Sequence, residues 1–345
     1  MPQDKKGPTL VGMTEGDLVT FLEQFGEPPF RARQIYHWIY GRHIASIGDM
    51  KNIPISLREQ LAGMANLHPL TRVTVTGAES ASSRKYLFAL STGETVESVL
   101  IHEKDRITVC VSTQVGCAVD CVFCATAKMG FNKNLTAGEI VDQGLQIQQD
   151  LKKRITNIVF MGMGEPFLNY EQVIKAAELL NDSNGPNIGA RKITISTAGI
   201  IPKIKRYSEE GHKYKLAISL NAASQEQRLA IMPITNPYPL KDLLRAAQSY
   251  YEETRNFITF EYVLLDRTND TPGDARRLIR LIGSLPCKLN IIPYNEIDSD
   301  YKRPSQERIA SFLTYLKEAP FTVTVRWSKG IDINAGCGQL ATSEA

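Results

Sequence analysis

The segment Gly116–Gly130, GCAVDCVFCATAKMG, places Cys117, Cys121 and Cys124 in a Cys-x3-Cys-x2-Cys pattern. Three thiolates on one short loop indicate a metal site, because thiolates bind both zinc and iron–sulfur clusters. A structural zinc site needs a fourth ligand, and no cysteine or histidine follows Cys124 until His212. Three thiolates instead suit a 4Fe-4S cluster in which the fourth iron stays open. The pattern therefore predicts one such cluster on this loop.

The aromatic residue Phe123 directly precedes the last cysteine of the loop. The spacing, together with this aromatic position, resembles the radical S-adenosylmethionine (SAM) superfamily, in which the amino and carboxylate groups of SAM chelate the open iron. The resemblance implies SAM as a second cofactor. The competing interpretation is a set of incidental or buried cysteines, but this loop holds half of the six cysteines in 345 residues.

The composition is that of an ordinary globular protein. With 43% hydrophobic and 22% charged residues, the chain is long enough for one large and one smaller domain. Its clustered cysteines do not resemble a secreted disulfide framework, so we expect a reducing, cytoplasmic environment. The sequence shows no long apolar run and no secretory leader, so we expect no membrane association. The formal net charge of +3 is too small to indicate nucleic-acid binding by itself.

Residues 1–75 are predicted to form a small helical accessory domain. Thr14 can cap a helix that runs to Phe25, and apolar residues recur at helical spacing farther along. The segment 30–40, FRARQIYHWIY, combines two arginines with four aromatic residues. Such a segment can stack on bases and neutralise phosphates, although an aromatic stripe is more often part of a core. The residues alone leave both interpretations open.

Residues 76–340 are predicted to form an α/β catalytic domain. From Cys110 onward, β-rich apolar runs alternate with helical stretches, which is typical of a parallel sheet covered by helices. Six βα units are too few for a complete eightfold barrel, so we expect a partial (βα)6 TIM-like barrel rather than a doubly wound sheet. In either fold the active site lies at the carboxyl ends of the strands, where the cysteine loop begins. The expected strands are 72–75, 85–90, 97–101, 107–112, 157–161, 192–197, 215–220, 257–264 and 288–293, and the expected helices begin near residues 136, 170, 202, 239, 272 and 305.

Polar residues follow several of these strands and favour a binding site. Gly164 and Glu165, in the segment MGMGEP, combine a close backbone approach with an acceptor for a cationic amine. Taken singly, each such residue is an ordinary turn former. Because parallel strands end at one edge of a sheet, the group as a whole favours a ligand site. This strand-end group consists of Gly164, Glu165, Ser196, Ser219, Leu220, Asn221 and Asn295.

The other three cysteines differ in their surroundings. Cys287 enters an apolar strand and is expected to be a buried hydrophobic residue. Cys337 lies between two glycines on what we expect to be a mobile tail, so it is either an accessible, reactive thiol or of no functional importance. Cys110 lies on the strand that leads into the cysteine loop, which places it near the same strand ends.

Longer motifs resemble the dual-specificity adenine methyltransferases of ribosomal RNA and tRNA, a family to which the antibiotic-resistance methyltransferase Cfr is closely related. The likeness runs from about residue 14 to residue 340. Two residues depart from the common pattern: Asn221 stands where histidine is common, and Gly336 stands where alanine is common. The matching segments are 30–35, 117–134, 161–166, 195–199, 218–221, 261–265, 289–293 and 330–340.

The resemblance implies a reaction that uses a thiol of the protein as a methyl carrier. The cysteine loop then binds the cluster, and the strand-end group binds SAM. Cys337 takes a methyl group from one SAM to become S-methylcysteine, and a second SAM is cleaved to a deoxyadenosyl radical that activates this methyl. After the carbon joins adenine, Cys110 forms a disulfide with Cys337, and Glu97 is the base that product release requires. Carbon 2 of adenine is electrophilic, so ordinary methyl transfer to it would fail.

The resemblance also implies substrates and partners. Carbon 2 of adenine is methylated in the peptidyl transferase centre of large-subunit rRNA and in tRNA, at the adenine 3′ of the anticodon, and residues 1–75 bind this RNA. We expect a monomer with an electron donor such as flavodoxin or ferredoxin. The alternative reaction is methylation at carbon 8 of adenine, because Cfr, which methylates carbon 8, shares all of these sequence motifs. A radical SAM enzyme acting on a protein partner shares only the cluster loop and the Gly164 to Glu165 segment, and a non-enzymatic iron–sulfur or RNA-binding protein needs no SAM pocket.

Overall fold

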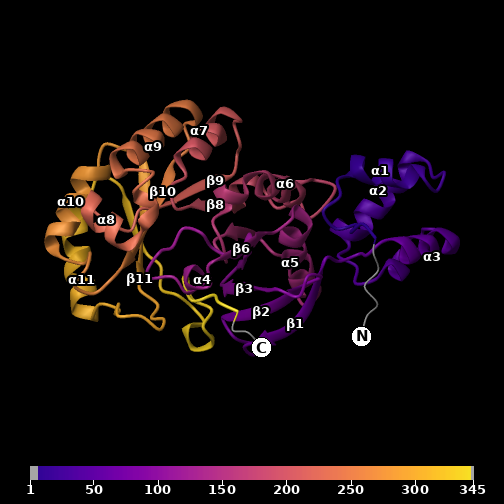
Figure 1. Ribbon diagram of the computed structural model, residues 1–345, viewed down its shortest axis with the longest axis horizontal. Helices are drawn as coiled ribbons and strands as arrows, with labels where there is room; N and C mark the ends of the chain where they lie inside the picture. The colour runs from indigo at the N-terminus through magenta and orange to yellow at the C-terminus, as the bar shows by residue number, and fades with distance from the viewer. Residues whose placement is uncertain (1–6, 343–345) are drawn as a thin grey trace.

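A ten-stranded sheet forms the centre of the molecule in the computed structural model, which describes residues 7–342. Its order is β1-β2-β3-β4-β7-β8-β9-β10-β11-β12, with β1 and β12 at the two edges. Figure 1 shows β1 and β2 well separated from β10 and β11. Strands β5 and β6 form a separate hairpin that carries the cysteine loop. The strands are β1 (Leu70–Thr76), β2 (Ser83–Leu90), β3 (Thr95–Glu103), β4 (Arg106–Cys110), β5 (Gln114–Gly116), β6 (Phe131–Asn134), β7 (Asn157–Phe160), β8 (Ile193–Thr197), β9 (Lys215–Ser219), β10 (Ile258–Leu264), β11 (Cys287–Pro293) and β12 (Thr322–Val325).

The sheet has a parallel part and an antiparallel part. Strands β4, β7, β8, β9, β10, β11 and β12 pair in parallel, whereas β1, β2 and β3 extend β4 as an antiparallel meander. This arrangement confirms the predicted α/β fold with an incomplete barrel. Strand β12 was not predicted, because its four residues are too few to show a pattern and it pairs only with β11.

Helices connect the parallel strands, and Figure 1 shows α7, α9, α10 and α11 in an arc around β9 to β11. The predicted start near Thr136 is confirmed by a capping box: the Thr136 hydroxyl accepts from the backbone N–H of Glu139, whose carboxylate accepts from the backbone N–H of Thr136. These helices cover the sheet and leave its strand ends accessible. They are α4 (Ala125–Lys128), α5 (Ala137–Gln149), α6 (Tyr170–Asn181), α7 (Ile201–Glu209), α8 (Gln225–Ile231), α9 (Leu240–Thr254), α10 (Pro272–Ile282) and α11 (Gln306–Tyr315).

The N-terminal residues form the helices α1 (Glu15–Glu23), α2 (Pro29–Tyr36) and α3 (Ile55–Met64). Figure 1 shows them beside α5 and α6, away from β9 to β11. Thr14 caps α1, as its sequence position predicts. No helix within residues 7–342 is long and apolar enough to cross a membrane.

The aromatic segment 30–40 is divided between core and surface. Tyr36 and Tyr40 are buried, and the Tyr36 hydroxyl donates to Asp182 at 2.8 Å, which joins this segment to the end of α6. Phe30, in contrast, is 52% exposed, with the guanidinium of Arg31 above its ring. The core interpretation therefore holds for Tyr36 and Tyr40, whereas binding of RNA at Phe30 stays a prediction.

Candidate active site

One cavity lies at the carboxyl ends of the parallel strands. It brings together side chains from β4, from the cysteine loop, from the loops after β7 to β9, and from the C-terminal segment. Chain segments more than two hundred residues apart in sequence therefore meet in one volume. Of the residues predicted from the sequence, the cavity is lined by Cys110, Cys117, Cys121, Cys124, Gly164, Glu165, Ser196, Ser219, Asn221 and Cys337.

The β5–β6 hairpin closes the base of the cysteine loop. The backbone N–H of Cys117 donates to the carbonyl oxygen of Gly130 at 2.9 Å. Gly116 has a positive φ of 71°, and a Cβ atom there would lie 1.7 Å from the same carbonyl oxygen, so only glycine fits. The backbone N–H of Cys124 then donates to the carbonyl oxygen of Cys121 at 3.1 Å, and this turn leads into α4.

The three loop cysteines share the cavity but are not arranged around one point. Among residues 7–342, no three cysteine, histidine or carboxylate side chains converge closely enough to ligate a single metal ion. Ligation of a 4Fe-4S cluster by Cys117, Cys121 and Cys124 stays a prediction.

The loop cysteines lie against an apolar shell. Val119, Phe123, Met232 and Tyr294 are buried around them. Burial raises the pKa of Cys117 to about 12 and that of Cys121 well above its usual value, with smaller contributions from neighbouring negative charges. In the absence of a cation these thiols hold their protons, and a positively charged metal centre would be needed to stabilise the thiolates.

Glu165 follows β7 and is almost completely buried. Its carboxylate accepts from the backbone N–H of Phe167 at 2.9 Å and from that of Ala198 at 2.6 Å. Burial raises the pKa of Glu165 to about 7, and these hydrogen bonds oppose the rise. Two backbone donors leave further lone pairs free, so the carboxylate can also accept from a cationic amine in the cavity.

Asn221 follows β9 and has a left-handed backbone with φ of 57°. Its side-chain oxygen accepts from the backbone N–H of Val263 at 2.9 Å, and its amide donates to the Met232 sulfur at 3.3 Å. Asn221 therefore links β9 to β10 as well as lining the cavity. Leu220 beside it is fully buried and does not line the cavity.

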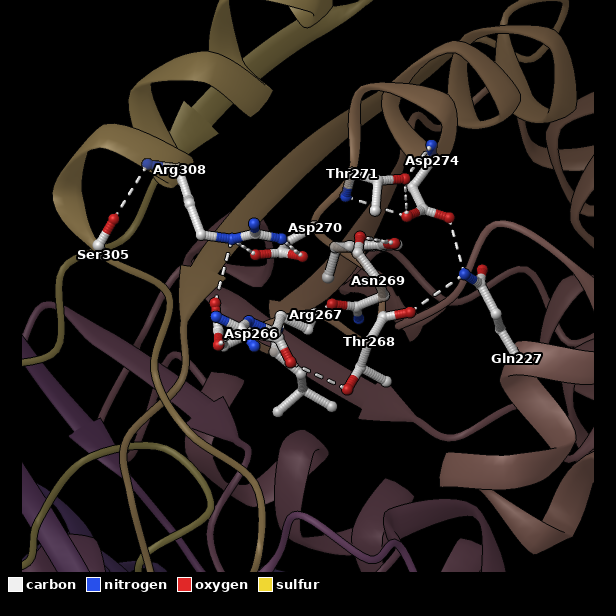
Figure 2. A network of polar contacts seen from close by, with 12 residues as sticks. Gln227, Asp266, Arg267, Thr268, Asn269, Asp270, Thr271, Asp274, Ser305 and Arg308 are labelled. Carbon is white, nitrogen blue, oxygen red and sulfur yellow. Dashed lines mark hydrogen bonds and ion pairs between the residues drawn. The ribbon is translucent and has the colours of Figure 1, made fainter.

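A polar network that includes Asn269, Asp270 and Arg308 holds the loop after β10 (Figure 2). The Asn269 amide donates to the Asn221 carbonyl at 2.7 Å and to the Val263 carbonyl at 2.8 Å. Next to it, Asp270 accepts two hydrogen bonds from the Arg308 guanidinium, at 2.6 and 2.5 Å. No local pattern in the sequence marks this network, because its members are polar residues that are common in turns.

The C-terminal segment is held in place, so the prediction of a mobile tail around Cys337 is wrong for the described residues. The Asn295 amide donates to the Cys337 carbonyl at 3.0 Å, and the backbone N–H of Ala125 donates to the Gly338 carbonyl at 2.8 Å. The Thr126 hydroxyl donates to the Leu340 carbonyl at 2.5 Å. The two glycines beside Cys337 do not indicate these hydrogen bonds in the sequence, because the bonding partners lie on distant segments of the chain.

Glu97 and Asn295 do not line the cavity. Both instead form hydrogen bonds to the C-terminal segment, which carries Cys337 at the cavity. Glu97 is buried, pairs with Lys85 at 2.8 Å and accepts from the backbone N–H of Ala341 at 3.1 Å. Burial raises the pKa of Glu97, and Lys85 opposes the rise. Asn295 lies close to Gly336, where a Cβ atom would come within 2.8 Å of the Asn295 amide nitrogen. Glycine at 336 therefore permits the close packing of this segment.

Cys110 and Cys337 are close enough for their charges to interact. Burial raises the pKa of Cys110 to about 12, and the proximity of Cys337 adds to the rise. The pKa of Cys337 is raised to about 11 by the protein around it, and the charge of Arg326 lowers both values. All six cysteines are free, and Cys287 is buried as predicted.

Two charged residues outside the predicted set also line the cavity, Glu261 on β10 and Arg326 after β12. Glu261 lies inside the segment 261–265, which had been noted only as a motif. Arg326 follows a strand that was not predicted, so no pattern placed it at this site.

These features define the class of the protein. An incomplete parallel barrel with a three-cysteine loop and a pocket at its strand ends is the arrangement of a radical SAM enzyme. The family model of the radical SAM superfamily matches residues 111–279. A second family model, that of the ribosomal RNA large subunit methyltransferase N-terminal domain, matches residues 9–67.

Individual relatives are more specific. The chain is 43% identical over 343 residues to the dual-specificity RNA methyltransferase RlmN of Anaeromyxobacter dehalogenans. The aligned region covers 97% of this chain and 92% of the relative. It is 42% identical over 327 residues to RlmN of Syntrophobacter fumaroxidans, with 94% and 95% covered. A solved radical SAM methyltransferase from Sphaerobacter thermophilus superposes with a TM-score of 0.94 at 42% identity, over 96% of this chain and 99% of that one. The chain therefore belongs to the RlmN family of radical SAM RNA methyltransferases.

Proposed function

We propose that this protein methylates carbon 2 of adenine in large-subunit rRNA and in tRNA, with Cys337 as the methyl carrier. The observation that carries the proposal is that Cys337, Cys110 and the cysteine loop line a single cavity. A radical SAM enzyme that only abstracts hydrogen from a protein partner needs the loop but not two additional thiols. A methyl carrier and a resolving thiol, by contrast, must both reach the same volume.

The residues fit the two cofactors that the superfamily uses. Cys117, Cys121 and Cys124 would hold a 4Fe-4S cluster, and Glu165 would accept from the amino group of SAM. Ser196 and Ser219 would offer hydroxyls to polar groups of the same molecule, with Asn221 and Asn295 beside them. When bound, the cluster and SAM supply a carbon radical, and we propose two SAM molecules per turnover.

Cys337 is proposed to accept a methyl group on its sulfur, for which it must first lose its proton. Cys337 is exposed, and the positive charge of Arg326 lowers the pKa of its thiol and so favours this loss. Asn295 fixes the backbone of Cys337 while its thiol faces the cavity. The methyl carbon then remains bonded to this sulfur after it has joined carbon 2 of the base.

Cys110 is proposed to release the product. Its thiolate attacks the Cys337 sulfur, so that a sulfur–sulfur bond forms, the carbon–sulfur bond breaks and the electron pair stays with the carbon on the base. Reduction of the disulfide by an external thiol then restores both cysteines. Before the attack by Cys110 the radical adduct must lose one electron, and Glu97 is proposed as the base that takes the proton lost from carbon 2 of adenine. The carbon released from Cys337 takes up a proton from solvent to become the new methyl group. The raised pKa of Glu97 suits a carboxylate that accepts a proton.

Residues 1–75 are proposed to bind the RNA. The exposed ring of Phe30 and the guanidinium of Arg31, which lies 5.0 Å from the ring centroid, form a surface on which a base can stack. We further propose a monomer that receives electrons from a flavodoxin or ferredoxin, which gel filtration and reduction assays with either donor would test.

Product analysis tests the proposed function. Reconstituted protein should be incubated with SAM, a reductant and either an rRNA fragment or tRNA, and the RNA digested to nucleosides for mass spectrometry. We expect 2-methyladenosine from both RNAs. A product containing only 8-methyladenosine would place the enzyme with Cfr, and methyl-free RNA with deoxyadenosine release would support the generic radical reaction.

A further inference from the structure

Glu261 is a buried carboxylate with an unused acceptor. The side chain lies on β10, is 6% exposed and lines the cavity beside Ser219. One carboxylate oxygen, Oε1, accepts from the Asn290 amide at 2.9 Å. The other, Oε2, is buried and has no hydrogen-bond partner among residues 7–342. A buried unpaired oxygen of this kind is costly, so it points to a ligand.

The contrast with Glu165 is informative. Both oxygens of Glu165 accept from backbone N–H groups, so that carboxylate is held by the protein on both sides. Glu261 is held on one side only, because Asn290 on the neighbouring strand fixes Oε1. This leaves Oε2 as a pre-oriented acceptor. The nearby Arg326 donates to the Met161 sulfur at 3.6 Å and forms no ion pair with Glu261 among the described residues.

The position of Glu261 places this acceptor near the reacting groups. Glu261 and Cys337 line the same cavity, together with Arg326, so both side chains face one ligand volume. The ligand that fills this space must present an N–H or O–H group to a carboxylate. Burial also raises the pKa of Glu261, which a donated hydrogen bond would reverse.

Both organic molecules that the proposed function brings to this cavity contain adenine. Adenine carries an amino group at carbon 6, which donates hydrogen bonds, whereas guanine and hypoxanthine carry an acceptor oxygen at the same position. We propose that Glu261 is the receptor for the 6-amino group of an adenine base and so selects adenine over 6-oxopurines. This inference rests on the proposed function for the identity of the ligands. The adenine is either that of SAM or the target base of the RNA, which one experiment can distinguish.

The informative substitution is Glu261→Gln, because it changes the chemistry of one atom with little change of shape. The Asn290 amide nitrogen donates to Oε1, so the glutamine oxygen is expected to take that place and to present its amino group to the cavity. The acceptor then becomes a donor, which disfavours a 6-amino group and favours a 6-oxo group. Glu261→Asp keeps the acceptor at a shorter reach and should keep the preference for adenine. Glu307→Gln, an exposed glutamate on α11, is the control.

The readout is binding to the reconstituted protein, measured by equilibrium dialysis. One arm compares SAM with S-inosylmethionine, and the other compares RNA oligonucleotides with adenine or hypoxanthine at the target position. We expect Glu261→Gln to weaken binding of the adenine ligand about tenfold or more in one arm, and to remove or reverse its preference over the 6-oxo ligand. The arm that changes identifies which adenine Glu261 binds.

Two results would overturn the inference. One is an unchanged preference for adenine in both arms when Glu261→Gln is folded, as shown by an unfolding midpoint close to that of Glu307→Gln. The other is an equal loss of affinity for the 6-amino and 6-oxo ligands, which indicates a structural role. Failure of the proposed function has a different signature, because the wild type would then carry no methyl group on Cys337, whatever the base preference in binding.

Discussion

The side-chain amide of Asn295 donates a hydrogen bond to the Cys337 carbonyl oxygen at 3.0 Å, and to the Ser328 hydroxyl at 2.7 Å. A residue after β11 therefore fixes the thiol of the C-terminal segment at the cavity. The distance between a methyl carrier and its two reaction partners is set by such contacts, because small displacements are costly for group transfer.

Replacement of Asn295 by aspartate tests this relationship. Aspartate has nearly the same shape but cannot donate to the Cys337 carbonyl, and its charge repels that oxygen. We expect residues 331–342 to exchange backbone hydrogens faster and the methylation of Cys337 to fall about tenfold. Hydrogen exchange and peptide mass spectrometry measure the two effects. Asn184→Asp, at an exposed turn, is the control, and unchanged exchange in Asn295→Asp would contradict the anchoring role.

Glu165 should make the ligand-free protein less stable at higher pH. Its folded pKa is about 7, raised by burial from an ordinary value of 4.5, so the folded state binds the proton more tightly than the unfolded state. The associated stability is fully present below pH 4.5 and is lost as the pH rises through 7, by an amount on the order of 3 kcal/mol.

The measurement is chemical unfolding of wild type and Glu165→Gln between pH 5 and 8, without ligands. We expect the free energy of unfolding of the wild type to fall relative to that of the variant as the pH rises. A parallel pH dependence of the two proteins would show that Glu165 does not titrate in this range. The variant should also bind SAM weakly, because it lacks the negative charge that the amino group requires.

The network of Asn269, Asp270 and Arg308 predicts a link between stability and cofactor binding. Asp270→Asn weakens the paired hydrogen bonds to Arg308, and we expect it to lower the free energy of unfolding by about 1–3 kcal/mol, since Arg308 is partly solvated. It should also loosen the loop that holds Asn221 and weaken SAM binding. Asp266→Asn is a matched control, because Asp266 contacts the same arginine at 3.0 Å from a more exposed position. Equal effects of both variants, measured by unfolding and dialysis, would argue against a special role for Asp270.

The surface of α2 should contribute to RNA affinity. Phe30→Ala removes an exposed ring, so stability should hardly change, but binding of tRNA should weaken about fivefold or more if a base stacks there. Ile55→Ala on α3, where the side chain is 65% exposed, is the control within the same helical part. Filter binding at fixed salt measures both, and equal affinities would exclude Phe30 from the RNA surface.

Local patterns in the sequence were sufficient for the framework of the site. The spacing of Cys117 to Cys124 and the capping box at Thr136 act over a few residues, so sequence alone located the loop and the helix that follows it. Glu261 and Asn290 could not be selected in this way. Their relationship depends on the register between β10 and β11, and the unpaired oxygen becomes apparent only when the surrounding atoms are placed.

The C-terminal segment shows the same limit. Two glycines beside Cys337 suggested mobility, because glycine has wide conformational freedom. In the fold, however, it is the absence of a side chain at Gly336 that allows close contact with Asn295 and Gln339. Whether a glycine loosens or tightens a segment depends on its spatial neighbours, which the sequence does not contain.

The most direct test of the proposed chemistry is denaturing electrophoresis of Cys110→Ala purified from cells. Cys110 is small and lines the cavity, so its replacement should leave folding and the cysteine loop intact. If Cys110 resolves the link between Cys337 and the base, this variant should accumulate RNA covalently attached to the protein. The slower band should disappear after nuclease digestion and be absent from Cys110→Ala/Cys337→Ala. Methylated RNA formed by Cys110→Ala at the wild-type rate, without any attached RNA, would contradict the account.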